Sequence, residues 1–288
     1  MLYLNEFRNP ALIDFFKNSG TNMFYIANAD YTEAIYNFYM QNLPALYNSY
    51  EMLADEESKK VFTAAIKGSL TRQIQDLRYA PEPQYFLEGF FPIEGDIAID
   101  GGAFNGVTSR DFAMQGAKVY AFEMSTENYQ KCLSYAEKYN FTVENLGLSY
   151  KEGQEFYSQG GSASRKGQGN LIGNFIDLDT YVLKKNLPRV DYIKLDIEGA
   201  ELDMLHGAAK TISRWKPKMA VSAYHKPQDL WTLANYIKSL RPDYEFKFRQ
   251  YKIDYTEYTL TEYERSVLNK FGLSFYIPTF GEMVLYCR

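Results

Sequence analysis

Apolar residues recur with two different spacings along the chain. Over residues 1–80 they return every three or four positions, as in Leu12, Phe15 and Phe16. This spacing lines up apolar side chains on one face of a helix. The first part of the chain is therefore expected to be helical.

A helix start and a proline break organise this N-terminal part. Asp55 can cap a helix that continues through Val61 and Leu70, because its carboxylate accepts hydrogen bonds from the free N–H groups of the first turn. Pro81 and Pro83 end the helical pattern, since proline cannot continue a helix. We therefore expect an N-terminal helical region at 1–85 and a second domain at 86–288.

Beyond residue 95, short apolar runs alternate with helical stretches. Strands are predicted at 97–100, 118–123, 141–145, 190–195 and 219–224. Helices are predicted at 107–115, 126–139, 200–215 and 228–240. In the second of these helices, Thr126 is the expected cap and Leu133 is expected to point inward. Such alternation is typical of a mostly parallel sheet.

Four other segments do not follow this alternation. The β-rich stretches at 244–249 and 283–286 could pair antiparallel at one edge of the sheet. Residues 151–170, rich in Gly, Ser and Gln, predict a loop or irregular hairpin. An aromatic-rich insertion at 250–278 is compatible with sugar stacking, a dimer surface or ordinary packing.

Composition narrows the class of protein. With 46% apolar and 23% charged residues the chain has an ordinary globular composition. Its net charge of -5 argues against nucleic acid as a partner. Two cysteines make no disulfide framework and fit a reducing cytoplasm. No apolar run reaches membrane-spanning length, so no transmembrane segment is expected.

Chemistry is predicted where the first two strands of the alternating part end. The first runs into Asp100 and a glycine-rich turn, and the second ends at Glu123. Glycine lets the backbone approach a ligand closely, and the helix start that follows presents free N–H groups. Ligands of open α/β sheets bind beyond this end of the strands. The pattern therefore predicts a nucleotide-sized site.

The acidic residues favour one class of ligand. The turn is no phosphate loop, because no Lys follows it, and Asp100 would repel the pyrophosphate of a dinucleotide. S-adenosylmethionine instead carries an ammonium, a sulfonium and a ribose, and Glu123 suits ribose hydroxyls. We therefore favour S-adenosylmethionine. The alternatives are a nicotinamide-dependent oxidoreductase and a non-catalytic cofactor-binding scaffold.

Three segments together resemble a known family. They are DGGAFNG at 100–106, AFE at 121–123 and DYIKLDIEGAE at 191–201, the last followed by LHGA at 205–208. Over roughly 85–288 the chain is similar to the FkbM family of class I S-adenosylmethionine-dependent methyltransferases. One departure is Met124, because the family pattern leads us to expect Pro there.

The resemblance implies a fold and a set of binding residues. The fold is the Rossmann-like α/β fold of class I methyltransferases, with helices on both faces of a mostly parallel seven-stranded sheet whose last strand is antiparallel. The residues implied to bind S-adenosylmethionine are Asp100, Gly101, Gly102, Ala103, Asn105, Gly106, Glu123 and Met124, with Asn145, Leu146 and Gly147 next to adenine.

Two residues that follow strands are the candidates for catalysis. Asp196 ends the 190–195 strand and His225 follows the 219–224 strand, so both face the predicted site. A base helps when the acceptor is a hydroxyl, and an unperturbed imidazole titrates near neutrality. We expect His225 to be the base and Asp196 to position the acceptor. A helix cap at Asp196 and a loop hydrogen bond at His225 are the structural alternatives.

Residues that contact the acceptor are expected around the same crevice. The candidates are Tyr85, Ser164, Arg165, Lys194 and Tyr224. The segments around the two tyrosines, 82–86 and 224–231, resemble a bacterial subset associated with surface glycans. Arg165 suits phosphate oxygens, and Lys194 could pair with Asp196. The sequence thus predicts a methyltransferase for a hydroxyl of a sugar, nucleotide-sugar or glycan precursor, with homo-oligomerisation left open.

A metal ion is not expected from the sequence. Asp196, Glu198, Glu201 and His225 are residue types that together can hold Mg²⁺ or Mn²⁺. Their spacing, however, is not specific for a metal.

Overall fold

The computed structural model describes most of the chain. The described residues are 29–71, 73–158, 165–167, 169–254, 267, 270, 276–277 and 281–288. The helical pattern predicted around Leu12, the acceptor candidate Ser164 and most of the aromatic insertion lie outside them. None of the described helices is long and apolar enough to cross a membrane.

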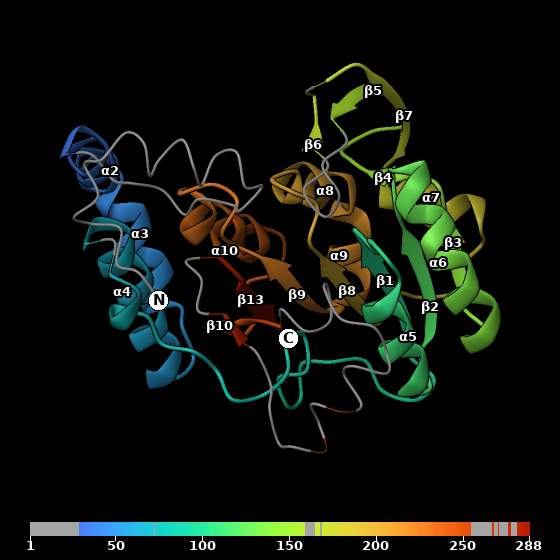
Figure 1. Ribbon diagram of the computed structural model, residues 1–288, viewed down its shortest axis with the longest axis horizontal. Helices are drawn as coiled ribbons and strands as arrows, with labels where there is room; N and C mark the ends of the chain where they lie inside the picture. The colour runs from blue at the N-terminus through green and yellow to red at the C-terminus, as the bar shows by residue number, and fades with distance from the viewer. Residues whose placement is uncertain are drawn as a thin grey trace.

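A seven-stranded sheet forms the centre of the molecule (Figure 1). Its strands, in spatial order, are β10 (Phe246–Gln250), β13 (Met283–Cys287), β9 (Lys218–Ser222), β8 (Tyr192–Leu195), β1 (Ile97–Gly101), β2 (Lys118–Phe122) and β3 (Thr142–Glu144). Neighbouring strands from β9 to β3 are parallel, whereas β13 runs antiparallel to both β9 and β10. The predicted class I methyltransferase sheet is therefore confirmed, and its antiparallel strand lies one position inside the edge.

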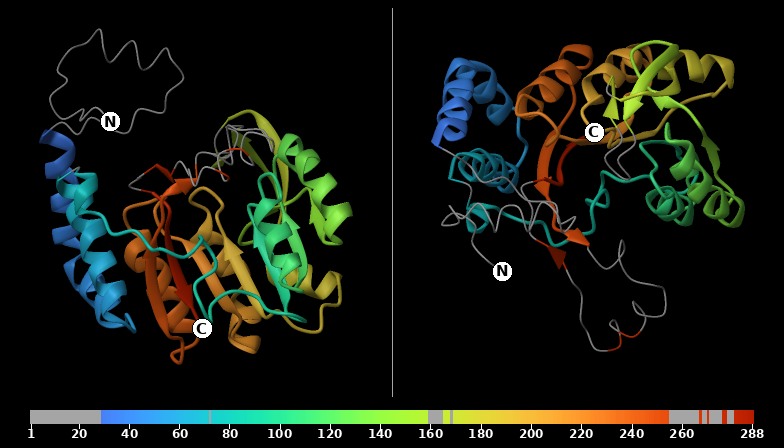
Figure 2. Two further views of the ribbon diagram at one scale, coloured as in Figure 1. Left: turned by 60° about the horizontal axis from the view of Figure 1, so that its bottom comes forward. Right: turned by 45° about the horizontal axis from the view of Figure 1, so that its top comes forward.

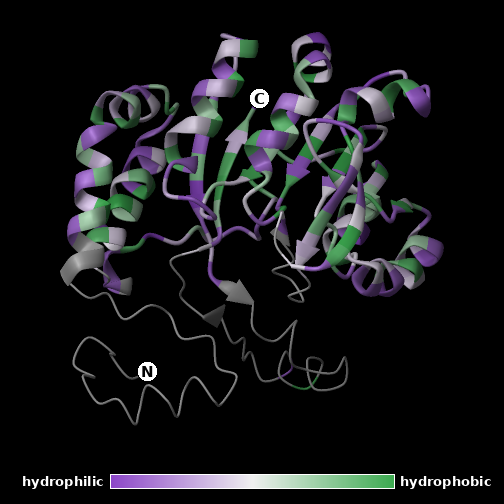
Figure 3. Cartoon of the chain, turned by 90° about the horizontal axis from the view of Figure 1, so that it is seen from above, coloured by the Kyte–Doolittle hydropathy of each residue, from purple (hydrophilic) through white to green (hydrophobic). Residues whose placement is uncertain are grey.

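Helices cover both faces of this sheet (Figure 2). On one face lie α5 (Val107–Met114) and α6 (Thr126–Tyr139); on the other lie α7 (Leu178–Lys184), α8 (Glu201–Gly207), α9 (Ala209–Trp215) and α10 (Asp229–Leu240). Because strand side chains alternate between faces, Ile97 and Ile99 belong to one apolar core while Ala98 belongs to the other. Coloured by hydropathy, the helices around the sheet show both apolar and polar residues along their length (Figure 3).

The N-terminal helices pack against the β10 edge. These are α2 (Ala29–Gln41), α3 (Leu43–Glu51) and α4 (Glu56–Thr71), followed by the short 3₁₀ helix η2 (Ile74–Asp76). Leu46 and Phe62 are buried in the same apolar core as the α10 side of the sheet, and Leu53 forms a β-bridge with Phe246. Asp55 caps α4 as predicted, accepting from the Ser58 N–H at 2.7 Å. The domain boundary at 85 stays a prediction.

A second, four-stranded sheet replaces much of the predicted loop at 151–170. It consists of β4 (Gly147–Leu148), β7 (Leu171–Ile176), β5 (Gly153–Ser158) and β6 (Arg165–Lys166). The hairpin expectation was therefore partly right, but the pairing of β5 with β7 extends beyond the segment. A separate pair joins β11 (Ile253–Asp254) to β12 (Tyr276–Ile277).

Three local predictions were wrong. The helix expected at 200–215 is divided into α8 and α9 at Ala208. Ser125, rather than Thr126, caps α6 by accepting from the Asn128 N–H. Leu133 is exposed, because Cys132 and Ala136 occupy the buried face of that helix.

Candidate functional site

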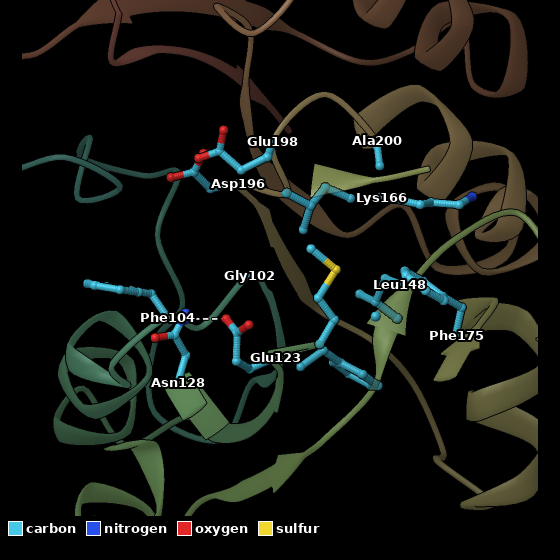
Figure 4. Close-up of a pocket in the computed structure, with 14 residues that line it drawn as sticks. Gly102, Phe104, Glu123, Asn128, Leu148, Lys166, Phe175, Asp196, Glu198 and Ala200 are labelled. Carbon is cyan, nitrogen blue, oxygen red and sulfur yellow. Dashed lines mark hydrogen bonds between the residues drawn. The ribbon is translucent and has the colours of Figure 1, made fainter. Parts of the chain in front are cut away.

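A cavity opens where β1, β2 and β8 end (Figure 4). Including its open mouth it has a volume of about 500 Å³. It is lined by Gly102, Phe104, Phe122, Glu123, Met124, Asn128, Gly147, Leu148, Lys166, Phe175, Asp196, Ile197, Glu198 and Ala200. One wall is therefore apolar, and the opposite rim carries carboxylates.

The glycine-rich turn forms the floor of this cavity. Gly102 has φ +77°, and a Cβ there would lie only 1.9 Å from the carbonyl oxygen of Asp196. The turn can therefore approach the end of β8 only because residue 102 is glycine. Gly102 and Ala103 donate their N–H groups to the carbonyl of Phe122 at 3.0 Å, which binds the turn to β2. Gly106 precedes α5 with a left-handed backbone.

Glu123 is held rigidly at the end of β2. One carboxylate oxygen accepts from the Phe104 N–H and the other from the Ser125 N–H, both at 2.8 Å. Burial raises the pKa of Glu123, against the lowering effect of these two bonds. Each oxygen keeps acceptor capacity toward the cavity, which is what recognition of neighbouring hydroxyls requires.

The residues predicted next to adenine follow β3. The amide of Asn145 donates to the carbonyls of Glu123 at 2.9 Å and Met124 at 3.2 Å, so it fixes this rim from behind. Gly147 lines the cavity, and a Cβ there would come within 2.3 Å of the Phe175 ring. Leu146 packs partly buried against the apolar core.

Asp100 lies buried beneath the glycine turn, and its predicted role in binding the donor stays a prediction. Its carboxylate is completely buried, accepts from the Ser109 hydroxyl at 2.5 Å and lies 3.0 Å from Lys194 Nζ. Lys194 also donates to the carbonyls of Gly101 and Gly102. Asp100 and Lys194 are not among the described residues that line the cavity, so they support the turn from below.

Asp196 lies at the rim of the cavity, between two tyrosines. The Tyr85 hydroxyl donates to Oδ2 at 2.9 Å and the Tyr224 hydroxyl to Oδ1 at 3.2 Å. Burial acts to raise the pKa of Asp196, but Lys194, His225 and the Tyr85 hydroxyl outweigh it and lower that pKa. Asp196 is therefore ionised at neutral pH.

His225 lies against three carboxylates. Its Nε2 is 3.5 Å from Asp196 and 3.6 Å from Glu198, and its Nδ1 is 2.9 Å from Glu201. Burial acts to lower the pKa of His225, but the carboxylates, Glu201 first, outweigh it and raise the pKa to about 9. An imidazolium has no free lone pair on nitrogen, so His225 must first lose this proton to act as the base, and that role stays a prediction.

Sequence reasoning missed several residues of the cavity. Phe104, Asn128, Leu148, Lys166 and Phe175 line it. Lys166 and Phe175 belong to the second sheet, whose place beside the main sheet no local pattern predicts. Of these residues, Phe104 could have been found from the sequence, because it lies inside the glycine turn. Of the predicted acceptor residues, Arg165 lies in β6. Tyr85 and Tyr224 contact the site by hydrogen bonds from their hydroxyls to the Asp196 carboxylate.

A second cavity of about 890 Å³ adjoins the first. It is lined by Tyr150, Glu155, Lys166, Gly167, Glu198, Gly199, Ala200, Asp203, His225 and Lys226. Lys166, Glu198 and Ala200 line both cavities, so the two meet at these residues.

Solved structures show where this fold occurs. A methyltransferase FkbM from Methylobacillus flagellatus KT has a TM-score of 0.68 and 24% identity, over 88% of this chain and 60% of that one. The chain thus spans 60% of the length of that protein, with which it shares a fold. A precorrin-6y C5,15-methyltransferase from Geobacter metallireducens is 8% identical, with a TM-score of 0.42 over 73% of this chain and 92% of that one.

A fibrillarin from Aeropyrum pernix, with natively bound S-adenosyl-L-methionine, is 11% identical, with a TM-score of 0.37 over 68% of this chain and 67% of that one. At these low TM-scores, neither of the last two similarities supports a further conclusion. No curated protein sequence matches the chain significantly.

Sequence families give a firmer result. The methyltransferase FkbM domain matches residues 100–253, from Asp100 of the glycine turn to the start of β11. This match covers more than half of the chain and includes all three segments on which the resemblance was based. The protein therefore belongs to the FkbM methyltransferase family.

Proposed function

We propose that the protein transfers a methyl group from S-adenosylmethionine to a hydroxyl of a small polar acceptor, a sugar or glycan precursor. Membership of the FkbM methyltransferase family and the cavity at the ends of β1, β2 and β8 support the methyl transfer. The observation that carries the choice of donor is Glu123, fixed at the cavity rim by two backbone N–H groups.

The residues present fit this donor. Glu123 would accept hydrogen bonds from the ribose hydroxyls, and the apolar wall of Phe122, Leu148 and Phe175 would receive the adenine ring. Gly102 would let the methionine part lie against the backbone of the turn. Because these groups are already fixed, they would align the donor with little further loss of conformational entropy in the protein.

The donor would supply a methyl group activated on a sulfonium. A bond would form from the acceptor oxygen to the methyl carbon. The C–S bond would break at the same time and leave its electron pair on sulfur. Asp196 would accept the hydroxyl proton. A carboxylate of low pKa suffices, because that proton becomes strongly acidic as the oxygen gains its third bond. Tyr85 and Tyr224 hold this carboxylate in place.

The second cavity is proposed to bind the acceptor. It meets the donor cavity at Glu198 and Lys166, and its lining contains carboxylate, ammonium and phenol groups. Such a lining suits a molecule with many hydroxyl groups, which both donate and accept. A nucleotide-sugar or another activated sugar fits this description.

Binding and transfer should be measured separately. Isothermal titration with S-adenosylmethionine and with a nicotinamide dinucleotide identifies the donor, and we expect saturable binding of the first alone. Incubation with labelled donor and a panel of nucleotide-sugars then tests transfer. Tight dinucleotide binding without S-adenosylmethionine binding would overturn the proposal. Donor binding without transfer to any hydroxyl acceptor would instead favour a scaffold role.

A further inference from the structure

A second kind of ligand is indicated where the two cavities meet. Asp196, Glu198 and Glu201, on the loop after β8 and the first turn of α8, surround His225 from the loop after β9. One ligand atom each of Asp196, Glu201 and His225 lie within 4.8 Å of one another. Figure 4 shows Asp196 and Glu198 extending from the loop after β8, with their carboxylates toward the same side of the cavity.

The imidazole provides a second, independent observation. The His225 side chain is only 5% exposed, and Nε2 makes no hydrogen bond to any residue that the structure describes. Nε2 instead faces Asp196 Oδ1 at 3.5 Å and Glu198 Oε2 at 3.6 Å, within ion-pair distance. Two carboxylate oxygens thus lie within 3.6 Å of one ring nitrogen.

The other ring nitrogen, Nδ1, also lacks a well-aligned hydrogen bond but lies closer to a carboxylate. Nδ1 lies 2.9 Å from Glu201 Oε1, and the same oxygen accepts from the N–H groups of Ile197 and Gly199. Glu201 therefore fixes both the loop and the ring. A carboxylate on the far nitrogen is the usual arrangement behind a metal-binding histidine, because it sets the tautomer and the direction of the ring.

We propose that Asp196, Glu198 and His225 Nε2 bind a divalent cation of the Mg²⁺ or Mn²⁺ class, which displaces the proton from Nε2, with Glu201 orienting the imidazole. Carboxylate oxygens with one imidazole form a donor set of this class. A metal was not expected from the sequence, since four residues spread over positions 196–225 have no diagnostic spacing. The fold brings them together.

The position of the cation suggests what it does, and this part rests on the proposed function. Asp196 and Glu198 line the donor cavity, and Glu198 and His225 line the second cavity. A cation at their junction would bind the acceptor hydroxyl through its oxygen, orient that oxygen toward the donor and increase the acidity of its proton. Asp196, bound to the cation through Oδ1, would then accept the proton on its other oxygen, Oδ2.

Manganese binding tests the site without any need for activity. Chelator-treated protein is titrated with Mn²⁺ while electron paramagnetic resonance measures the free ion. We expect one saturable site in the wild type, with nitrogen coupling from His225 in the bound spectrum. Glu198→Gln and His225→Gln should each weaken binding at least tenfold, and His225→Gln should abolish the nitrogen coupling. Glu152→Gln is the matched control, because the exposed Glu152 side chain pairs with Lys184 and lines neither cavity.

The outcomes separate this inference from the proposed function. A wild type without a saturable Mn²⁺ site, or equal affinities in wild type, Glu198→Gln and His225→Gln, would overturn the cation site. S-adenosylmethionine binding is measured on the same samples. Donor binding without Mn²⁺ binding refutes only the cation site. Mn²⁺ binding without donor binding refutes the proposed function and leaves the cation site standing.

Discussion

Lys194 Nζ lies 3.0 Å from Asp100 Oδ1, and both side chains are buried beneath the glycine turn. The pair joins neighbouring strands, since Lys194 is on β8 and Asp100 on β1. Lys194 also donates to the carbonyls of Gly101 and Gly102. One buried ammonium thus fixes the turn against the sheet.

Replacing this ammonium should destabilise the fold. Lys194→Met leaves Asp100 as a buried charge without its partner, which costs about 3–5 kcal/mol. Urea denaturation should show that loss in the free energy of unfolding. Lys184→Met is the control, because the Lys184–Glu152 pair is exposed and should change stability by less than about 0.5 kcal/mol. Equal losses in both variants would contradict a special role for the buried pair.

Glu123→Gln should weaken donor binding by about tenfold, since a carboxylate gives a stronger hydrogen bond to a ribose hydroxyl than an amide does, by about 1.4 kcal/mol. Isothermal titration with S-adenosylmethionine measures the change. Glu127→Gln serves as a control, because Glu127 is exposed on α6 and pairs with Lys131. An unchanged affinity in Glu123→Gln would remove Glu123 from the donor site.

Gly102→Ala should damage both stability and donor binding. Its Cβ would lie 1.9 Å from the backbone of Asp196 and would occupy a left-handed conformation, so we expect a loss of about 2 kcal/mol or more. Gly153→Ala is the matched control, since a Cβ there has no described atom within 4 Å. Thermal unfolding with and without the donor gives both readouts. Similar melting temperatures in the two variants would be incompatible with the close approach described.

Asp196→Asn should remove most of the methyl transfer while donor binding remains. Loss of a positioned proton acceptor lowers kcat by about 10²–10⁴-fold. Single-turnover transfer to a confirmed acceptor measures the rate, and titration with S-adenosylmethionine checks the affinity. A variant with wild-type kcat would show that another group takes the proton.

Acid should weaken the attachment of the N-terminal helices through Asp55. Hydrogen bonds from Arg249 and Ser58 outweigh burial and lower the pKa of Asp55 in the folded state. A depressed carboxylate pKa stabilises the fold above the unfolded value of about 3.9, and this contribution is lost as pH falls below it toward the folded value. Between about pH 5 and pH 2, the free energy of unfolding should therefore fall less steeply with decreasing pH in Asp55→Asn than in the wild type. Parallel pH profiles would contradict this linkage.

Local sequence patterns predicted the central sheet well. Apolar runs such as 97–100 and 118–123 became β1 and β2 because both faces of each strand are buried. Patterns failed where a tertiary contact decided the outcome. The polar stretch at 151–170 became β5 and β6 because β5 pairs with β7. The helix at 200–215 divided, and Leu133 came to face outward.

Of the candidate site, the sequence located the strand ends but not the environment of each side chain. Glu123 and Gly102 could be found because a strand followed by an acid or a glycine turn is a local pattern. The burial of Asp100 could not be predicted in this way. Its partner Lys194 is 94 positions further along the chain and meets it only across the β1–β8 pairing.

The sequence by itself thus determined the fold class, the family and the edge of the sheet where the cavity lies, because strand periodicity, glycine turns and the motif at 191–201 are local properties. Only the tertiary structure decided the charge state around His225. The loop after β8 places Asp196, Glu198 and Glu201 around this imidazole and raises its pKa to about 9. Coulomb interactions depend on distances between side chains, and residues far apart in sequence acquire those distances only when the chain folds.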